Sequence, residues 1–193
     1  MMPTSIDHII VIGGSAGSLP VLLQVLENLP PNFSIPVIVV LHRLKNVASD
    51  LQGILASVQQ TQKIKEPEDK EAIKRRHVYI APQNYHLLVE ADKTFSLDYS
   101  EPVHYSRPSI DVSFESVVRV FGPKTIAILL SGANQDGADG MEAVVAANGV
   151  AIAQSPETSE YPAMPVAAIE KNAKVKSMAP EKIVEYLHQL TVE

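Results

Sequence analysis

Solid apolar runs alternate with segments of helical periodicity along most of this chain. The runs leave no polar face to show to water, which is typical of strands buried on both faces of a parallel sheet. They span residues 9–12, 35–41, 125–130 and 150–153. The other segments carry apolar side chains at helical spacing. They span residues 18–29, 48–59, 111–121, 138–148, 164–172 and 181–190. This alternation predicts an α/β fold, a doubly wound, mostly parallel sheet with helices on both faces.

The middle of the chain departs from this alternation. Three short strand-like segments follow one another at 77–82, 86–90 and 95–99, and Asp92-Lys93 separates the last two at hairpin spacing. We therefore expect a small antiparallel hairpin appended to the main sheet. No internal repeat or long linker divides the sequence, so residues 1–193 are expected to form a single domain.

Local signals mark several helix ends. Ser18 can cap the first helix, whose early turn tolerates Pro20. Asn46 or Ser49 can cap the second helix. Gly149 is placed to end the helix at 138–148.

The first buried strand runs into a glycine-rich turn, Gly13-Gly14-Ser15-Ala16-Gly17, which places Ser15 at the junction of a strand and a helix. One interpretation is a nucleophile elbow, because the spacing matches G-x-S-x-G. A second is a phosphate-binding loop, although neither G-x-G-x-x-G nor GK[ST] is present. A third is a turn of small residues needed only for close packing of helix on strand. This stretch alone leaves all three open.

Three polar residues follow three of the apolar strands. Ser15, His42 and Asp136 lie just past the ends of these runs, and ligands of open parallel sheets bind at the carboxyl ends of the strands. A hydroxyl, an imidazole and a carboxylate are the parts of an activated nucleophile, defined by geometry and not by sequence order. We expect the three side chains to meet, with hydroxyl-to-imidazole and imidazole-to-carboxylate separations near ~3 Å.

Simpler roles compete for these residues and their neighbours. His42 also fits as a polar residue that only ends a strand, and Asp136 as a cap or turn residue. Asp139 is expected to cap a helix and Asp111 to add negative charge at a helix start. The other histidines fall before a strand, in the hairpin, in a loop or on the last helix; they are His8, His77, His86, His104 and His188.

Composition and charge narrow the class of protein. The chain has 193 residues, 46% hydrophobic and 20% charged, which suits one globular domain. No apolar run is long enough to span a membrane and no signal peptide is evident, so a cytoplasmic location without membrane insertion is expected. The absence of cysteine excludes disulfides and thiolate chemistry. A net charge of -6 argues against nucleic acid as a partner, and the Lys74-Arg75-Arg76 cluster is expected to be solvated surface.

A set of motifs, in this order, resembles the catalytic domain of the chemotaxis receptor protein-glutamate methylesterases, the CheB type, over nearly the whole chain. The motifs are Ile12-Gly13-Gly14-Ser15-Ala16-Gly17, Leu41-His42, Tyr79-Ile80-Ala81-Pro82 with Tyr85-His86-Leu87, Arg107-Pro108-Ser109-Ile110-Asp111 with Phe114-Glu115-Ser116, Leu130-Ser131-Gly132-Ala133-Asn134-Gln135-Asp136-Gly137-Ala138-Asp139-Gly140, Ala153-Gln154 and Met164-Pro165.

The resemblance implies roles for named residues. Ser15 is the implied nucleophile, His42 the general base and Asp136 its partner. The positions of Ala16 and Ala133 lie at the oxyanion site in this family. The resemblance leaves open whether Arg107, Asp111 and Met164 bind substrate or only brace loops. It implies no cofactor and no metal.

The sequence departs from the family pattern in three ways. The family usually has Thr at the position of Ala16 and Met at that of Ala133, so loss of these side chains affects substrate fit and rate. Asn134 stands where the family has Gly, which Asn tolerates if φ is positive. The amino-terminal receiver domain common in the family is not expected here, nor is control by phosphorylation in cis.

The expected activity is hydrolysis of glutamate γ-methyl esters on the cytoplasmic helices of chemoreceptors, with glutamine deamidation as a second activity. A receptor methyltransferase and a separate receiver protein are further expected partners. One alternative is a degenerate, non-catalytic module that docks on the receptor or the methyltransferase. The other alternative is a hydrolase of a different ester or amide.

Overall fold

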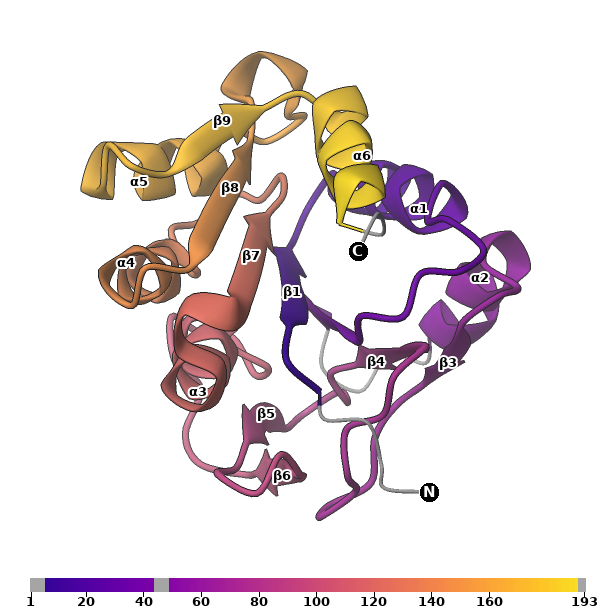
Figure 1. The fold of residues 1–193 in the computed structure, drawn as a ribbon. Coiled ribbons are helices and arrows are strands. Elements are labelled where there is room, and N and C mark those ends of the chain that lie inside the picture. The colour runs from indigo at the N-terminus through magenta and orange to yellow at the C-terminus, as the bar shows by residue number, and fades with distance from the viewer. Residues whose placement is uncertain (1–5, 44–48, 191–193) are drawn as a thin grey trace.

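A seven-stranded parallel sheet forms the centre of the computed structural model, which describes residues 6–43 and 49–190 (Figure 1). Its strand order is β3-β4-β2-β1-β7-β8-β9, and every neighbouring pair is parallel. The strands are β1 (Ile9–Gly14), β2 (Val37–Leu41), β3 (Lys63–Lys65), β4 (His77–Ile80), β7 (Thr125–Leu129), β8 (Val150–Gln154) and β9 (Lys176–Met178). The predicted doubly wound α/β fold is confirmed, with β1 at its centre.

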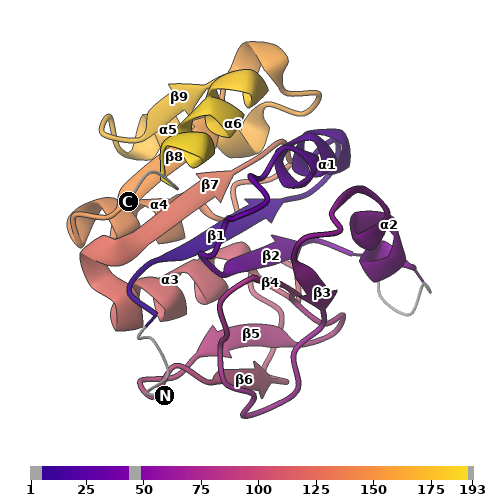
Figure 2. The same ribbon diagram turned by 45° about the vertical axis from the view of Figure 1, so that its right-hand side comes forward.

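Helices cover both faces of this sheet, as Figures 1 and 2 show. Alternate side chains of β1 enter different cores, because successive side chains of a strand point to opposite faces. Ile9 and Val11 pack toward α3 (Ile110–Phe121), α4 (Ala138–Ala146) and α5 (Ala163–Lys171). Ile10 and Ile12 pack toward α1 (Leu19–Glu27), α2 (Leu51–Val58) and α6 (Pro180–Gln189). All four side chains are buried, which agrees with the absence of a polar face in this run.

Short 3-10 turns, Gly122–Lys124 and Pro156–Thr158, complete the regular structure. None of the helices in residues 6–43 and 49–190 is long and apolar enough to cross a lipid bilayer.

The antiparallel hairpin is present but smaller than predicted. It consists of β5 (His86–Val89) and β6 (Phe95–Asp98) and packs beside α3. The segment at 77–82, grouped with the hairpin in the sequence analysis, instead supplies β4, which lies between β3 and β2 in the parallel sheet. The reason is burial. Val78, Tyr79 and Ile80 are almost completely buried, and a strand inside a sheet that has helices on both faces provides such burial.

Two edge strands were not predicted from the sequence. β3 and β9 have three residues each and begin with lysine, so they are too short to show a period. Short, charged edge strands discourage pairing with other chains.

The caps of the first two helices differ from the predictions. The Ser18 hydroxyl accepts no bond from α1 and donates to the carbonyl oxygen of Ser15 at 2.6 Å. Asp50 caps α2 by accepting from the Gly53 N–H at 2.9 Å. The Ser49 hydroxyl is engaged by the Arg43 guanidinium instead, and Asn46 lies outside the described residues.

The end of α4 also differs from the prediction. The residue in the left-handed conformation is Asn148, with φ 60°, and not Gly149. The Gly149 N–H still bonds back to the Val144 carbonyl oxygen at 2.9 Å. Asparagine can adopt this conformation because its short polar side chain tolerates positive φ.

Candidate active site

Ser15 and His42 follow neighbouring strands at the carboxyl edge of the sheet. The β1–β2 register pairs Gly14 with Leu41, and the His42 N–H donates to the Gly14 carbonyl oxygen at 3.1 Å. On its other side Ser15 donates its N–H to the carbonyl oxygen of Ser131, which follows β7, at 2.9 Å. The β1–β7 border is also where the strand order reverses, the usual ligand-binding position in such sheets.

The side chain of His42 continues the alternation of β2. Ile38 and Val40 pack on the α3 side, and His42 is the next residue of that series. The strand periodicity therefore directs the His42 side chain toward the start of α3. In β1, Ile9 and Val11 pack on the same side, and Ser15 directly follows the last residue of the strand, Gly14.

His42 and Asp136 form a close pair. Nε2 of His42 lies 2.7 Å from Oδ2 of Asp136, which belongs to the loop after β7. The Asp136 side chain is fully buried and that of His42 is 11% exposed. The predicted imidazole-to-carboxylate contact is confirmed.

The start of α3 holds the Asp136 carboxylate in place. Oδ1 accepts from the Ser109 hydroxyl and the Asp111 N–H, both at 3.0 Å, and Oδ2 accepts from the Ile110 N–H at 2.8 Å. Asp136 thus accepts hydrogen bonds from the start of α3, a helix distant in sequence, whereas α4 directly after it begins at Ala138 with Gly137 as its N-cap residue. Free N–H groups at a helix start suit a carboxylate because they are unpaired donors at the positive end of the helix.

These donors decide the ionisation of Asp136. Burial alone would raise the pKa of this carboxyl group, because a charge is poorly solvated in the protein interior. The bonds from His42 and from the N–H groups of Asp111 and Ile110 outweigh burial and lower the pKa to about 2. Asp136 is therefore a carboxylate that only accepts hydrogen bonds.

Gly13 allows α3 to approach the sheet this closely. A Cβ at Gly13 would lie 2.5 Å from Cγ2 of Ile110 and 3.0 Å from Cζ of Phe114. The missing side chain therefore brings the first turn of α3 to the end of β1. That approach places its N–H groups around Asp136.

The Ser15 hydroxyl lies at the same edge of the sheet but does not contact the His42–Asp136 pair through a hydrogen bond in the described residues. Ser15 is half-buried, and within residues 6–43 and 49–190 its hydroxyl makes no hydrogen bond to His42. The predicted contact of hydroxyl with imidazole is thus not formed in this structure. Because Nε2 of His42 is bonded to Asp136, Nδ1 is the ring nitrogen left to accept a proton from Ser15.

Ala16 and Ala133 are both exposed at the same edge. In the described part of the chain, neither of their N–H groups donates a hydrogen bond. Asn134 does not need positive φ, since the residue with positive φ in this loop is Gly137, at 99°. The loop around Asn134 borders a cavity of about 420 Å³ against Ala163 and Val166 of α5.

Arg107 and Met164 contact other parts of the protein. Arg107 donates through Nη1 to the carbonyl oxygens of Tyr99 and Ser100, and its guanidinium stacks 3.8 Å from the Tyr99 ring centre. Met164 is fully buried, and a Cβ at Gly132 would lie 2.5 Å from its Cε. Both side chains therefore support the loops beside the site.

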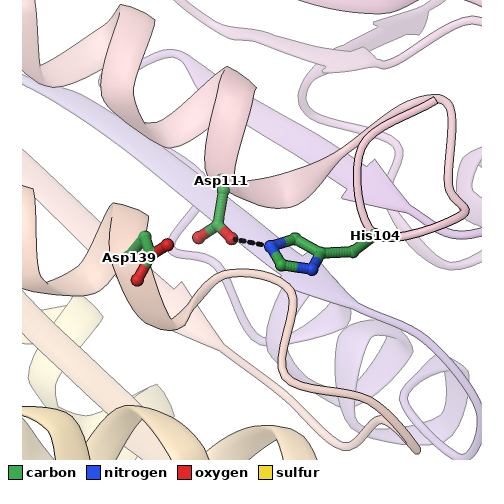
Figure 3. A group of neighbouring side chains, drawn as sticks. All are labelled: His104, Asp111 and Asp139. Carbon is green, nitrogen blue, oxygen red and sulfur yellow. Dashed lines mark ion pairs between the residues drawn. The ribbon is translucent and has the colours of Figure 1, made fainter. Parts of the chain in front are cut away.

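Asp111 is a direct neighbour of Asp136, to which it donates its N–H, and its own side chain makes other contacts. Its Oδ1 accepts from the Gly140 N–H at 2.8 Å, and its Oδ2 lies 3.4 Å from Nε2 of His104 (Figure 3). Burial and the nearby charge of Asp136 together raise the pKa of Asp111 to about 7, against the lowering effect of the Gly140 bond. Asp139 does not cap α4; it pairs with Lys171.

Sequence reasoning missed the contributions of Ser109 and His86. The Pro108-Ser109 pair signals a helix start, and Ser109 does cap α3, but the sequence does not show that its hydroxyl also bonds Asp136. His86, assigned to the hairpin, is buried and accepts the Ser109 N–H at Nδ1. No local signal links residues so far apart.

A cavity of about 670 Å³ lies at the opposite edge of the sheet. Its lining includes His8, Ile35 and Lys124, which precede β1, β2 and β7. It also borders Ile6 and Leu190, next to the ends of the chain that the structure does not describe. We therefore place the site by its chemistry at the carboxyl edge.

The profile of the CheB methylesterase family matches residues 10–187. The chain belongs to the CheB methylesterase family. The resemblance drawn from the motifs is thereby confirmed, as is the prediction of a hydrolase of the methylesterase type at the level of the family.

Relatives and a solved structure agree with this membership. A protein of Leptospira interrogans is 44% identical over 181 residues, which cover 94% of this chain and 93% of that protein. A Thermotoga maritima protein-glutamate methylesterase/protein-glutamine glutaminase is 34% identical over 97% of this chain, which spans 55% of that longer protein. The crystal structure of the Thermotoga maritima CheB methylesterase catalytic domain superposes with a TM-score of 0.90 and covers 97% of this chain and 100% of that one.

Proposed function

We propose that this protein hydrolyses glutamate γ-methyl esters on the cytoplasmic helices of chemoreceptors, using Ser15, His42 and Asp136. The observation that carries the proposal is the 2.7 Å pair of His42 and Asp136 at the sheet edge where Ser15 also lies. Family membership supports the ester as substrate. The substrate's location requires the protein to work in the cytoplasm.

The proposed reaction has two halves. The Ser15 hydroxyl oxygen attacks the ester carbonyl carbon while Nδ1 of His42 takes its proton, and Asp136 stabilises the imidazolium through Nε2. Collapse of the tetrahedral intermediate breaks the bond to the methoxy group, which leaves as methanol with the proton from His42. Water then attacks the acyl-serine with His42 again accepting a proton, and glutamate and free Ser15 are released.

The free N–H groups of Ala16 and Ala133 are the proposed donors to the oxyanion. Backbone donors do not depend on the side chain, so the hole survives the replacement of Thr and Met by alanine. The same steps with a side-chain amide release ammonia, which makes glutamine deamidation a compatible second activity. Arg107, Asp111 and Met164 are proposed to position loops and not to touch the ester.

The experiment is an assay of methanol release from purified, methylated receptor fragments, with small methyl esters tested in parallel. The His42→Ala variant serves as the blank. Methanol released from the receptor above this blank supports the proposal. Binding of the receptor without methanol release would indicate a non-catalytic module, and turnover of small esters alone would indicate another hydrolase.

A further inference from the structure

His104, Asp111 and Asp139 form a second cluster beside the site, and it takes no part in the proposed hydrolysis (Figure 3). One ligand atom from each residue lies within 4.8 Å of the other two. The residues come from a loop, the first turn of α3 and the first turn of α4. Imidazole nitrogen and carboxylate oxygen are both ligands of divalent metal ions.

The buried Oδ2 of Asp111 points into this cluster. Asp111 is 5% exposed, and in residues 6–43 and 49–190 its Oδ2 accepts no hydrogen bond. Its nearest partner is Nε2 of His104, at 3.4 Å. A buried carboxylate oxygen without a donor is costly, and a bound cation supplies the missing contact.

A tight turn fixes His104 over the start of α3. Val103 and Ser106 exchange backbone hydrogen bonds of 3.1 and 2.9 Å. The two residues between them, His104 and Tyr105, both have positive φ, at 48° and 61°. This geometry leaves the Tyr105 side chain in solvent and turns the His104 ring toward Asp111.

Space for further ligands lies next to the cluster. A cavity of about 330 Å³ is lined by His104, Gln135, Asp139 and Lys171, among others. Water in this cavity can complete a coordination shell that the protein fills only in part. The ammonium group of Lys171 already pairs with Asp139, so a metal ion would replace it as the counter-ion.

We propose that His104, Asp111 and Asp139 bind a divalent transition-metal ion of the zinc type, with water as the remaining ligand. One imidazole with two carboxylates suits Zn²⁺, whereas Mg²⁺ prefers an octahedral shell of oxygen ligands. The bound ion joins the 103–106 turn to the starts of α3 and α4. It is a structural ion, and its presence does not depend on the proposed hydrolysis.

The test is calorimetric titration of the metal-stripped protein with ZnCl₂ at neutral pH, followed by thermal unfolding of the same samples. The expected result is saturable binding of one Zn²⁺ per chain, much weaker binding of Mg²⁺, and a higher Tm with Zn²⁺. His104→Ala and Asp139→Asn should each weaken Zn²⁺ binding at least about tenfold, since even groups behind metal ligands have effects of that size. Lys171→Met should strengthen binding because it removes the competing ammonium.

Two variants serve as matched controls. Glu142→Gln removes a carboxylate on α4 that also lies near Lys171, at 3.6 Å, but is not one of the three proposed ligands. His8→Ala removes an exposed histidine outside the cluster. Both should bind Zn²⁺ as the wild type does. Absence of saturable binding, unchanged binding in His104→Ala and Asp139→Asn, or an equal loss in Glu142→Gln would overturn the proposal.

Discussion

Nε2 of His42 lies 2.7 Å from Oδ2 of Asp136, although 94 positions separate the two residues in the sequence. The contact results from the topology, because β2 and β7 flank β1 and end at the same edge. Asp136 is then held by the start of α3, which Gly13 allows to approach the sheet. The pair is therefore as rigid as the sheet and helix that carry it.

Asp136→Asn should abolish most of the activity. The amide keeps the size of the side chain but loses the charge that stabilises the His42 imidazolium. Its nitrogen also cannot accept a hydrogen bond from the N–H groups of α3. We expect kcat to fall about 10⁴-fold, as for the equivalent change in a serine protease. Ser109→Ala removes one donor to Oδ1 and leaves the His42 contact intact, so its loss should be much smaller.

Methanol release by the two variants and by the wild type measures this difference. Equal losses of kcat in Asp136→Asn and Ser109→Ala would contradict this prediction. They would show that activity depends on the hydrogen bonds at the start of α3 and not on the charge of the carboxylate.

Gly13→Ala should lower both stability and activity. The new methyl group collides with Ile110, whose N–H binds Asp136, and overpacking of a core usually costs about 1–3 kcal/mol. Urea unfolding gives the free energy of unfolding for Gly13→Ala, Ile110→Ala and the double variant. The double variant should lose less stability than the sum of the single variants, because Ile110→Ala removes the colliding atom. Strict additivity would count against the packing account.

Tyr79 should make the fold sensitive to alkali. Its side chain is fully buried, and its hydroxyl oxygen accepts from the Lys74 N–H at 3.0 Å. Burial raises the pKa of Tyr79 from 10.0 to about 12. Since the folded pKa exceeds the unfolded one, the contribution is complete below pH 10 and is lost as the pH rises toward 12.

Urea unfolding as a function of alkaline pH checks this prediction. Tyr79→Phe should remove that part of the decline, and it should reduce stability at neutral pH by about 1 kcal/mol because the Lys74 N–H loses its acceptor. The control is Tyr99→Phe, at a tyrosine that is 65% exposed. An alkaline decline that persists unchanged in Tyr79→Phe would refute the assignment.

The sequence predicted the layers of the fold and the His42–Asp136 pair for the same reason. Buried parallel strands are solid apolar runs, and the first polar residue after each run lies at the shared carboxyl edge. The sequence did not separate β4 from the hairpin, because a short apolar run fits either position. The clustering of His104 with Asp111 and Asp139 could not be predicted from the sequence either, because it depends on a tight turn and on the starts of two helices from distant segments.

The role of Ser15 is the central claim, and the kcat/KM for methanol release from methylated receptor by Ser15→Ala tests it most directly. The variant should fold as the wild type does, because the half-buried hydroxyl makes no hydrogen bond to His42 in the described structure. The matched control is Ser57→Ala, at an exposed serine on α2, which should keep full activity. We predict a loss of roughly 1000-fold or more for Ser15→Ala. Activity of Ser15→Ala within about tenfold of the wild type would contradict the account.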